Sequence, residues 1–542
     1  MKVVSGQVMQ LMDQRAIREF GTPGLTLMEN AGTACADAIT ETFGPGAGKT
    51  ALIVAGKGNN GGDGFVISRI LAERGWHAPV LLLAAADSIT GDAAANLSRL
   101  NSATVICAPE GPAGHAELFQ NAALVVDALL GTGLKNDVSG IYAEAIGMIN
   151  AAGVPVVAVD IPSGVDAANG RVLGRAVRAD LTVSFALPKL GNILHPGAGL
   201  CGRLIVADIG MPDAVVSDAS GYEFIDLGAA KRLFRPRSAA AHKGSSGHCL
   251  IIAGSTGKTG AAAMSANSAV RCGAGLVTLA VPAGLNEILE VKSTEAMTLP
   301  VGRPGSGYLP AGALSELLLA AKGRDAVALG PGIGASASTF YLVQSLISSL
   351  PGPLVLDADA LNAIATAPEL LLTRRGRVTL LTPHPGEMAR LVGCSIAEVE
   401  ADRIGCAAGF AARFQVYLIL KGARSIIAAP DGSIAINGSG NPGMASGGMG
   451  DVLTGVLAAL VGQGYDPFQA CQLAAFVHGH AADMLVKRKG TQGLNATDVQ
   501  EMLPEALCQL RQSVNAYPRL RERVAEGRVR GFCAAETGTA KS

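Results

Sequence analysis

A glycine-dense segment in the last quarter of the chain constrains the fold more than any other stretch. Residues 441–455 read NPGMASGGMGDVLTG, in which four glycines come shortly before Asp451 and an apolar run follows it. A glycine loop that leads into a helix brings unsatisfied backbone N–H groups and the positive end of the helix dipole to one place. Such a junction binds anions, and phosphate groups in particular. We therefore expect an anion site at the start of a helix in this part of the chain.

Asp451 stands where its carboxylate would face the bound phosphate. Because like charges repel, an aspartate in this place needs a further role, such as holding a metal ion or accepting a proton. The alternative interpretation is an ordinary helix N-cap. The preceding glycines favour the first interpretation, since glycine lets the backbone approach a ligand closely. Asp451 is thus our predicted catalytic base.

The glycine loop resembles the GxGD anion hole of ribokinase-like enzymes, and in its full form it is more similar to the ADP/ATP-dependent NAD(P)H-hydrate dehydratases. Further motifs resemble this family in the same order, over roughly residues 240–508: ALGPGIG (Ala328–Gly334), LVLDADALN (Leu354–Asn362), LLTPHPGE (Leu380–Glu387) and LILKGARS (Leu418–Ser425). The resemblance implies a ribokinase-like fold. It also implies a dehydratase that uses ADP or ATP as co-substrate together with Mg²⁺.

The same resemblance implies roles for particular residues of the second half. Those that match nucleotide-binding positions are Lys421, Gly422, Ala423, Arg424, Ser425, Gly447, Gly448 and Gly450. Those that match hydrate-binding positions are Ala261, Gly334, His384 and Asp451. Structural alternatives remain, because His384 could be a strand-end histidine and Lys421 a surface lysine with a buried stem. Asp357 and Asp359 either help to hold magnesium or cap the next helix.

The first half shows a similar alternation of short apolar strands and helical segments. Residues 51–55 form an apolar run that leads through GKGNNGGDG into the helical segment FVISRILAERG. Further strands are expected at Pro79–Ala84, Leu124–Asp127, Pro155–Asp160, Leu181–Phe185 and Arg203–Asp208. This alternation predicts a mostly parallel sheet covered on both faces. Ligands bind such sheets at the carboxyl ends of the strands, where Asp127 and Asp160 stand.

Asn60, Asp127 and Ser163 all lie on these strand-end loops, so we expect them to converge. They offer only oxygen ligands, and an oxygen-only set favours a hard cation. The spacing does not say which cation. Three loop-capping polar residues are the equally weighted alternative.

Four motifs in order make the first half similar to the YjeF-type N-terminal domain, the NAD(P)H-hydrate epimerase: GKGNNGGDG, DALLGTG, DIPSGVD and ALPKLGNILHPG. The resemblance implies that potassium binds Asn60, Asp127 and Ser163. It implies that substrate is held by Asn59, Asn60, Gly61, Gly62, Asp63, Gly131, Thr132, Gly133, Leu134, Lys135, Asn136, Asp137 and Asp160. Epimerisation needs acid–base groups beside a flat ring, and Asp160 is our candidate with Lys189 as helper. A structural contact in the PKLG turn is the alternative for Lys189.

Together these patterns predict an α/β protein of two three-layer domains. Residues 1–227 would form a Rossmann-like epimerase domain, and residues 228–510 a ribokinase-like dehydratase domain. We expect the segment from Tyr222 to Ala241 to connect the two domains. Its later part is rich in Pro, Ser and Ala. Residues 511–542 are expected to be a flexible tail.

Charge and composition exclude several classes of protein. The formal net charge is -1 without long runs of one sign, which argues against nucleic-acid binding. We expect neither a signal peptide nor a membrane span. The ten cysteines lack metal-binding spacing, which indicates a reduced cytoplasmic protein. We also expect a homo-oligomer.

The expected function is repair of hydrated nicotinamide nucleotides (NADHX and NADPHX). The first half would interconvert the R and S epimers, and the second would dehydrate the S epimer with ADP or ATP. The alternative is a ribokinase-like small-molecule kinase fused to a nucleotide-binding scaffold. The preference for ADP or ATP, and for NADHX or NADPHX, stays open.

Overall fold

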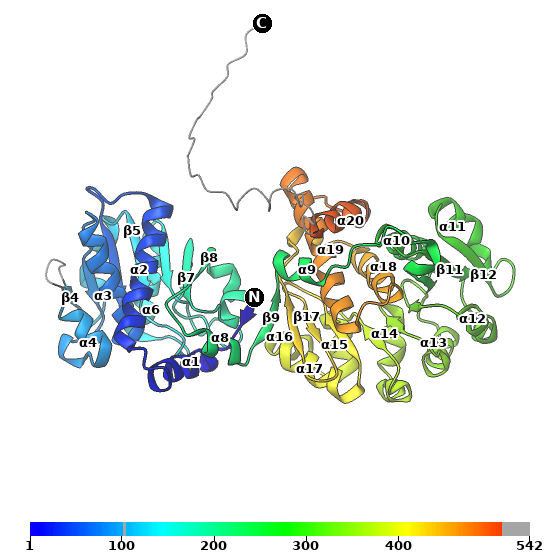
Figure 1. The fold of residues 1–542 in the computed structure, drawn as a ribbon, viewed down its shortest axis with the longest axis horizontal. Coiled ribbons are helices and arrows are strands. Elements are labelled where there is room, and N and C mark those ends of the chain that lie inside the picture. Colours follow the sequence, from blue (N-terminus) through cyan, green and yellow to red (C-terminus); the bar gives the residue numbers. More distant parts are fainter. Residues whose placement is uncertain (101–104, 512–542) are drawn as a thin grey trace, which may run out of the picture.

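The fold consists of two parallel-rich sheets, each covered by helices on both faces (Figure 1). This computed structural model describes residues 1–100 and 105–511. Within these residues the chain forms one sheet of seven strands and one of eleven. The expected tail, 511–542, lies outside the described residues apart from Arg511. The α/β class with two three-layer units is as predicted.

The smaller sheet is entirely parallel. Its strands run in the order β4 (Val105–Cys107), β3 (Val80–Leu82), β2 (Ala51–Ala55), β5 (Leu124–Ala128), β6 (Val156–Val159), β7 (Leu181–Phe185) and β8 (Arg203–Ala207). The strand order reverses between β2 and β5. The loops that follow these two strands therefore open a crevice, which is where ligands bind in such sheets.

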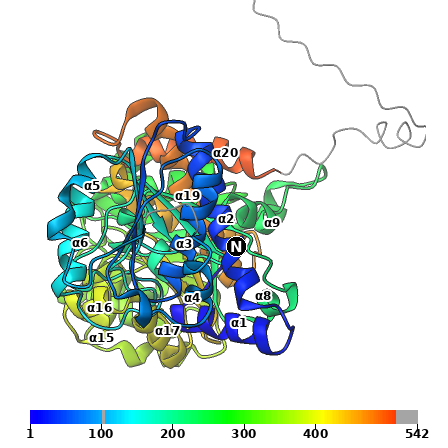
Figure 2. The ribbon, with the colours of Figure 1, turned by 90° about the vertical axis from the view of Figure 1, so that its left-hand side faces the viewer.

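Alternate side chains of the smaller sheet pack into two different layers, because successive residues of a strand point to opposite faces. Ile53 packs towards α1 (Gly6–Arg18), α2 (Gly24–Phe43), α3 (Asn59–Glu73), α4 (Gly91–Leu97) and α8 (Asp213–Asp218). Leu52 and Val54 pack towards α5 (Ala116–Gln120) and α6 (Gly140–Ala151). Figure 2 shows α5 and α6 on one side of the domain and α2 and α3 on the other.

The larger sheet is parallel at its centre and antiparallel towards one edge. Its order is β1 (Lys2–Val3), β9 (Tyr222–Ile225), β18 (Ile434–Asn437), β17 (Ile426–Ala428), β16 (Tyr417–Leu420), β15 (Thr379–Leu381), β14 (Leu354–Leu356), β13 (Ala326–Leu329), β10 (His248–Ile252), β11 (Leu276–Pro282) and β12 (Met297–Val301).

One face of the larger sheet is covered by α9 (Leu227–Leu233), α10 (Thr259–Arg271), α11 (Asn286–Lys292), α18 (Met449–Gly462), α19 (Pro467–Lys489) and α20 (Ala496–Leu510). The other is covered by α12 (Leu314–Ala320), α13 (Ala337–Ser349), α14 (Asp359–Ile364), α15 (Pro385–Val392), α16 (Ile396–Ala401) and α17 (Arg403–Phe414).

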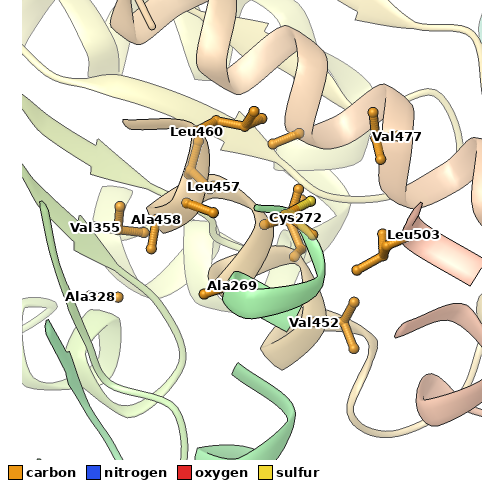
Figure 3. Close-up of a cluster of buried hydrophobic side chains, with 14 of the residues drawn as sticks. Ala269, Cys272, Ala328, Val355, Val452, Leu457, Ala458, Leu460, Val477 and Leu503 are labelled. Atoms are coloured by element: carbon orange, nitrogen blue, oxygen red, sulfur yellow. The ribbon is translucent and has the colours of Figure 1, made fainter. Parts of the chain in front are cut away.

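Helix α18 is buried on all sides, as its uniformly apolar sequence requires. Figure 3 shows Leu457 and Ala458 on the side of Val355 and Ala328 of the sheet, with Ala269, Val477 and Leu503 from the surrounding helices nearby. A side chain at Gly455 would collide with the Ser265 carbonyl of α10. The helix that carries Asp451 is therefore held rigidly from several directions.

The segment from Tyr222 to Ala241 differs from the expected connector. It begins with β9, which pairs in parallel with β18 and antiparallel with β1, and continues with α9. The larger sheet thus recruits strands that precede residue 228, including one from the first residues of the chain. The sequence signal was missed because Tyr222–Ile225 is short and lies next to Pro- and Ser-rich residues.

Within residues 1–100 and 105–511, no helix is both long and apolar enough to cross a bilayer. The nine cysteines in this part of the chain are all free thiols.

Candidate functional sites

The crevice of the smaller sheet opens into a cavity of about 840 Å³. Most of the predicted epimerase residues line it: Asn59, Asn60, Asp63, Gly131, Thr132, Gly133, Leu134, Lys135, Asn136, Asp137, Asp160 and Lys189. Gly61 and Gly62 do not line it. Added side chains there would meet the Gly56 carbonyl and the Met28 sulfur, so these glycines allow the start of α3 to pack closely.

Asp160 and Lys189 form a buried ion pair at the cavity wall. Lys189 is fully buried, and its Nζ also donates to Ser184 Oγ at 3.2 Å and to the Phe185 carbonyl at 3.0 Å. Asn192 connects the two residues, since it accepts from the Lys189 amide at 2.8 Å and donates to the Asp160 carbonyl at 3.2 Å. A lysine so enclosed needs the carboxylate as a partner.

Asp160 has a φ of +67°, in the left-handed region that non-glycine residues rarely adopt. It directly follows β6, so this turn aims its carboxylate at Lys189. Its Oδ1 also accepts from the Phe185 amide at 3.1 Å. Strained backbone of this kind persists where the surroundings determine it, commonly at functional sites.

Asp13 and Asp63 also face this cavity, and the sequence interpretation missed Asp13. Burial raises the pKa of Asp13 to about 6, with Lys189 opposing and Asp160 adding to the increase. Burial, Asp160 and Asp13 raise the pKa of Asp63 well above its usual range. Asp13 could have been noticed, because it lies among Met9, Met12 and Ala16 on the buried side of α1.

Asp127 and Ser163 are in direct contact beneath this cavity. The Ser163 hydroxyl donates to Asp127 Oδ1 at 2.6 Å, and the Ser163 amide donates to Oδ2 at 2.8 Å. Burial raises the pKa of Asp127 to about 6 against the effect of these hydrogen bonds. The Leu130 amide donates to Ser163 Oγ at 2.9 Å, which fixes the loop after β5.

Asn60 lies against the same loop. A Cβ added to Gly131 would be 3.4 Å from the Asn60 Cβ. The buried Asn60 Nδ2 has no hydrogen-bond partner among the described residues. The structure thus brings Asp127 and Ser163 together and places Asn60 on the adjoining side of the 130–131 loop.

The second site lies at the start of α18. Gly448 is the N-cap residue with a φ of +89°, and Asp451 is the third residue of the helix. Burial raises the pKa of Asp451 to about 7, with Asp357 adding to the increase and Lys421 opposing it. This carboxyl group can therefore exchange a proton near neutral pH.

Lys421 pairs with Asp357 instead of Asp451. Its Nζ lies 2.8 Å from Asp357 Oδ1 and 3.8 Å from Glu387 Oε2. Burial alone would lower the pKa of Lys421, but these two carboxylates raise it overall. The Thr454 hydroxyl donates to Asp357 Oδ2 at 2.8 Å. A Cβ at Gly450 would be 3.2 Å from Lys421 Nζ, which explains the glycine there.

Asp359 is turned away from this pair because Ala358, between the two aspartates, has a φ of +51°. Asp359 Oδ2 accepts from the Gly334 amide at 2.9 Å and from Lys258 Nζ at 2.9 Å. Ala261 lies beside Gly332, with its Cβ 3.1 Å from a Cβ added to that glycine. Asp359 thus holds the amide of the predicted hydrate-binding residue Gly334, and its charge adds to the rise in the pKa of Asp451.

His384 is tied to the cluster through Glu387. The His384 amide donates to Glu387 Oε2 at 2.8 Å, while its own Nδ1 accepts from the Gly386 amide at 3.0 Å and caps α15. Burial lowers its pKa, against the effect of Glu387. A half-exposed, uncharged imidazole therefore borders the site.

A cavity of about 520 Å³ adjoins this cluster. The predicted nucleotide residues Lys421, Gly422, Ala423, Arg424, Ser425 and Gly450 line it, whereas Gly447, Gly448, Ala261, Gly334, His384 and Asp451 do not. His478 of α19 also lines it and was missed. Burial and Lys421 lower the pKa of His478 to about 4, and its Nε2 has no partner within the described chain. Its position in the apolar run AAFVHGHAA was the available signal.

The two units and their sites define a fusion of a YjeF-type N-terminal module with a dehydratase module. A family profile described as YjeF-related protein N-terminus matches residues 24–191, and one described as NAD(P)H-hydrate dehydratase matches residues 249–505.

Whole-length relatives share this organisation. The bifunctional NAD(P)H-hydrate repair enzyme Nnr of Moorella thermoacetica is 44% identical over 95% of this chain and 98% of its own. The one from Thermofilum pendens is 40% identical over 94% of this chain and 97% of its own. The ADP/ATP-dependent NAD(P)H-hydrate dehydratase of Bacillus subtilis, co-crystallized with ATP/Mg2+, is 27% identical with a TM-score of 0.46, over 53% of this chain and 99% of its own.

The chain belongs to the family of bifunctional NAD(P)H-hydrate repair enzymes. The predicted family, and with it the pairing of an epimerase with a dehydratase, is confirmed.

Proposed function

We propose that the first half interconverts the R and S epimers of hydrated NADH and NADPH, and that the second half dehydrates the S epimer with ADP or ATP. One observation carries the second assignment. Asp451 has a pKa of about 7 at the positive end of α18, beside a cavity lined by Lys421–Ser425. A base of this pKa is suited to accept a proton from a substrate hydroxyl at neutral pH.

The chemistry of dehydration explains the need for a nucleotide. Hydroxide leaves poorly from carbon 6 of the hydrated ring. The hydroxyl oxygen instead attacks the terminal phosphorus of the nucleotide, loses its proton to Asp451 and becomes a phosphate ester. The ring nitrogen lone pair then expels phosphate as the carbon–oxygen bond breaks. Loss of a proton from carbon 5 restores the dihydropyridine, with AMP formed from ADP or ADP from ATP.

The chain supplies the groups that this transfer requires. The backbone N–H groups of Gly447–Gly450 would hold the phosphoryl group, and Lys421 would balance its charge. Magnesium, when bound, neutralises phosphate charge and is held largely by the nucleotide's own oxygens. Asp357 and Asp359 are the nearby carboxylates, although each already has a lysine partner.

In the first half, Asp160 and Lys189 are the proposed acid–base pair. The shared hydrogen bond lets a proton pass between them beside the ring held in the 840 Å³ cavity. Asn59, Asn60, Asp63 and the segment Gly131–Asp137 would hold the substrate, because they line the same cavity beyond the ends of β2 and β5.

Asn60, Asp127 and Ser163 fit a monovalent cation such as potassium. The set offers only oxygen ligands, and a cation would favour the ionised form of buried Asp127. The unpartnered Asn60 amide can present either its nitrogen or its oxygen, since the two are assigned only from their partners. Bound there, the ion would supply positive charge beside the 130–131 loop.

The test is incubation with a mixture of R and S NADH hydrate plus ADP or ATP, following the absorbance of reduced nicotinamide. We expect full recovery of NADH with equimolar release of phosphate. Accumulation of a phosphorylated hydrate without NADH would instead show a kinase. Recovery of only the S fraction would show that the first half does not epimerise.

Cytoplasmic location and a homo-oligomer stay predictions from the sequence. Light scattering on the purified protein measures the oligomeric state directly, and a monomer would contradict the second prediction.

A further inference from the structure

The nucleotide cavity of the second half contains one residue of the first half. His195 lines this cavity, while its other lining residues come from 421–479. His195 follows α7 (Leu190–Ile193), whose N-cap residue is Lys189 of the epimerase site. Lys189 of one site and His195 in the wall of the other are therefore only six positions apart in the sequence.

The segment around His195 is anchored to the second half by packing. Leu190, Ile193 and Leu194 are buried in the same hydrophobic cluster as Ile426 and Ile436 of β17 and β18. Buried aliphatic side chains of this kind contribute about 1.5–3 kcal/mol each.

Backbone hydrogen bonds hold the same segment from both ends. The Val4 amide donates to the Pro188 carbonyl at 3.1 Å, and the Leu190 amide donates to the Val4 carbonyl at 2.9 Å. Val4 directly follows β1, which pairs with β9 of the larger sheet. On the other side, the Gly197 amide donates to the Gly170 carbonyl at 2.8 Å. His195 is thus positioned by the fold.

The charge and shape of His195 suit the uncharged part of a nucleotide. Burial, Arg424 and Arg403 lower its pKa, so the imidazole is neutral at pH 7. Lys421 already supplies a cation next to Gly450, where the phosphoryl group is proposed to lie. Arg424 is occupied elsewhere, because it donates to the Gly438 carbonyl and lies 5.5 Å from the Phe224 ring centre. A flat neutral ring can pack against a nucleobase.

We propose that His195 contacts the nucleoside part of the bound ADP or ATP, so that the epimerase half completes the dehydratase nucleotide pocket. This inference rests on the proposed function of the second half. His195 is a binding residue in this proposal, and the phosphoryl chemistry stays with Asp451 and Lys421.

The test is calorimetric binding of AMP and ADP to the full-length protein and to His195→Ala, His195→Phe and His77→Ala. His77 is an exposed histidine of the same half that is not part of the cavity wall. We expect His195→Ala to weaken the binding of AMP and of ADP by the same factor. That factor should be on the order of tenfold, as for the loss of one base-stacking side chain. His195→Phe retains a flat ring and should bind within about threefold of the wild type. His77→Ala should bind normally.

The kinetic counterpart is a rise in KM for ADP by the same factor in His195→Ala, with kcat for dehydration and the epimerisation rate unchanged. Unchanged AMP and ADP binding in His195→Ala would overturn the inference. If His195→Ala lost more affinity for ADP than for AMP, the assignment to the nucleoside part would be overturned. The same would follow if His195→Phe bound the nucleotides as weakly as His195→Ala. Failure of the wild-type protein to bind ADP would instead reject the proposed function.

Discussion

The two candidate sites place an aspartate and a lysine in different arrangements. Each has an aspartate and a lysine at the carboxyl ends of parallel strands. In the first half, fully buried Lys189 contacts the proposed catalytic residue Asp160 itself. In the second half, Lys421 contacts Asp357, while Asp451 is left without a lysine contact and its pKa rises to about 7.

This difference matches the two reactions. A paired aspartate and lysine can share a proton, which suits the acid–base epimerisation proposed for the first half. An aspartate with a pKa near 7 can accept a proton once and release it to water after the product leaves. If the two arrangements act independently, substitutions in one site should leave the other activity unchanged. The expected effects follow from the largest to the smallest.

Asp451→Asn should separate the sites most strongly. It keeps the side-chain shape but removes the base, so dehydration should fall by about 10² to 10⁴ while epimerisation is unchanged. Nucleotide binding should persist or tighten, because a negative charge next to the phosphates is gone. Single-turnover dehydration and ADP calorimetry on one preparation measure both. Near-normal turnover would show that Asp451 is not the base.

Lys189→Met should lower epimerisation and also destabilise the first half by about 3–5 kcal/mol, because it leaves Asp160 buried without a counterion. The matched control is Lys189→Met combined with Asp160→Asn, which removes both charges. The double variant should regain stability in urea unfolding but not epimerisation. Recovery of activity in the double variant would show that the pair is structural, and dehydration of the S epimer should persist throughout.

Asp127→Ala tests the proposed cation site separately from the ion pair. Loss of a ligand should weaken potassium dependence and lower epimerisation by about 10- to 100-fold at limiting potassium. Dehydration of the S epimer should be unaffected, because Asp127 lies in the first half. Equal loss of both activities would contradict two independent sites.

The two sites should also differ in their pH dependence, which is the smallest of the expected effects. Asp451 has its pKa raised to about 7 and acts only when ionised, so kcat for dehydration should rise with pH and level off above about 7. Below about pH 7, kcat for dehydration should fall about tenfold per pH unit. Epimerisation followed in the same buffers should not share this midpoint. A dehydration profile that is flat between pH 5 and 8 would remove Asp451 as the base.

Sequence patterns located the strand ends well because the relevant chemistry is local there. A glycine loop between a strand and a helix can only place Asp451 at the helix start. Asp127 lies next to the last residue of β5 and Ser163 follows β6, and the two side chains meet as expected. Asp13 and His478 were not predicted as site residues because each lies within a helix. An isolated polar residue among apolar ones in a helix does not indicate which residue it faces.

By itself, the sequence determined the α/β class, the family and the strand-end loops, because backbone continuity dictates what directly follows a strand. Tertiary structure alone decided which charges pair. Lys421 lies 64 residues from Asp357 in sequence, yet its ammonium contacts that carboxylate. Tertiary structure also decided that β1 and β9 extend the larger sheet and that His195 enters the nucleotide cavity. These contacts join segments remote in the chain. Their strength depends on the buried, water-poor surroundings, which exist only once the layers have packed.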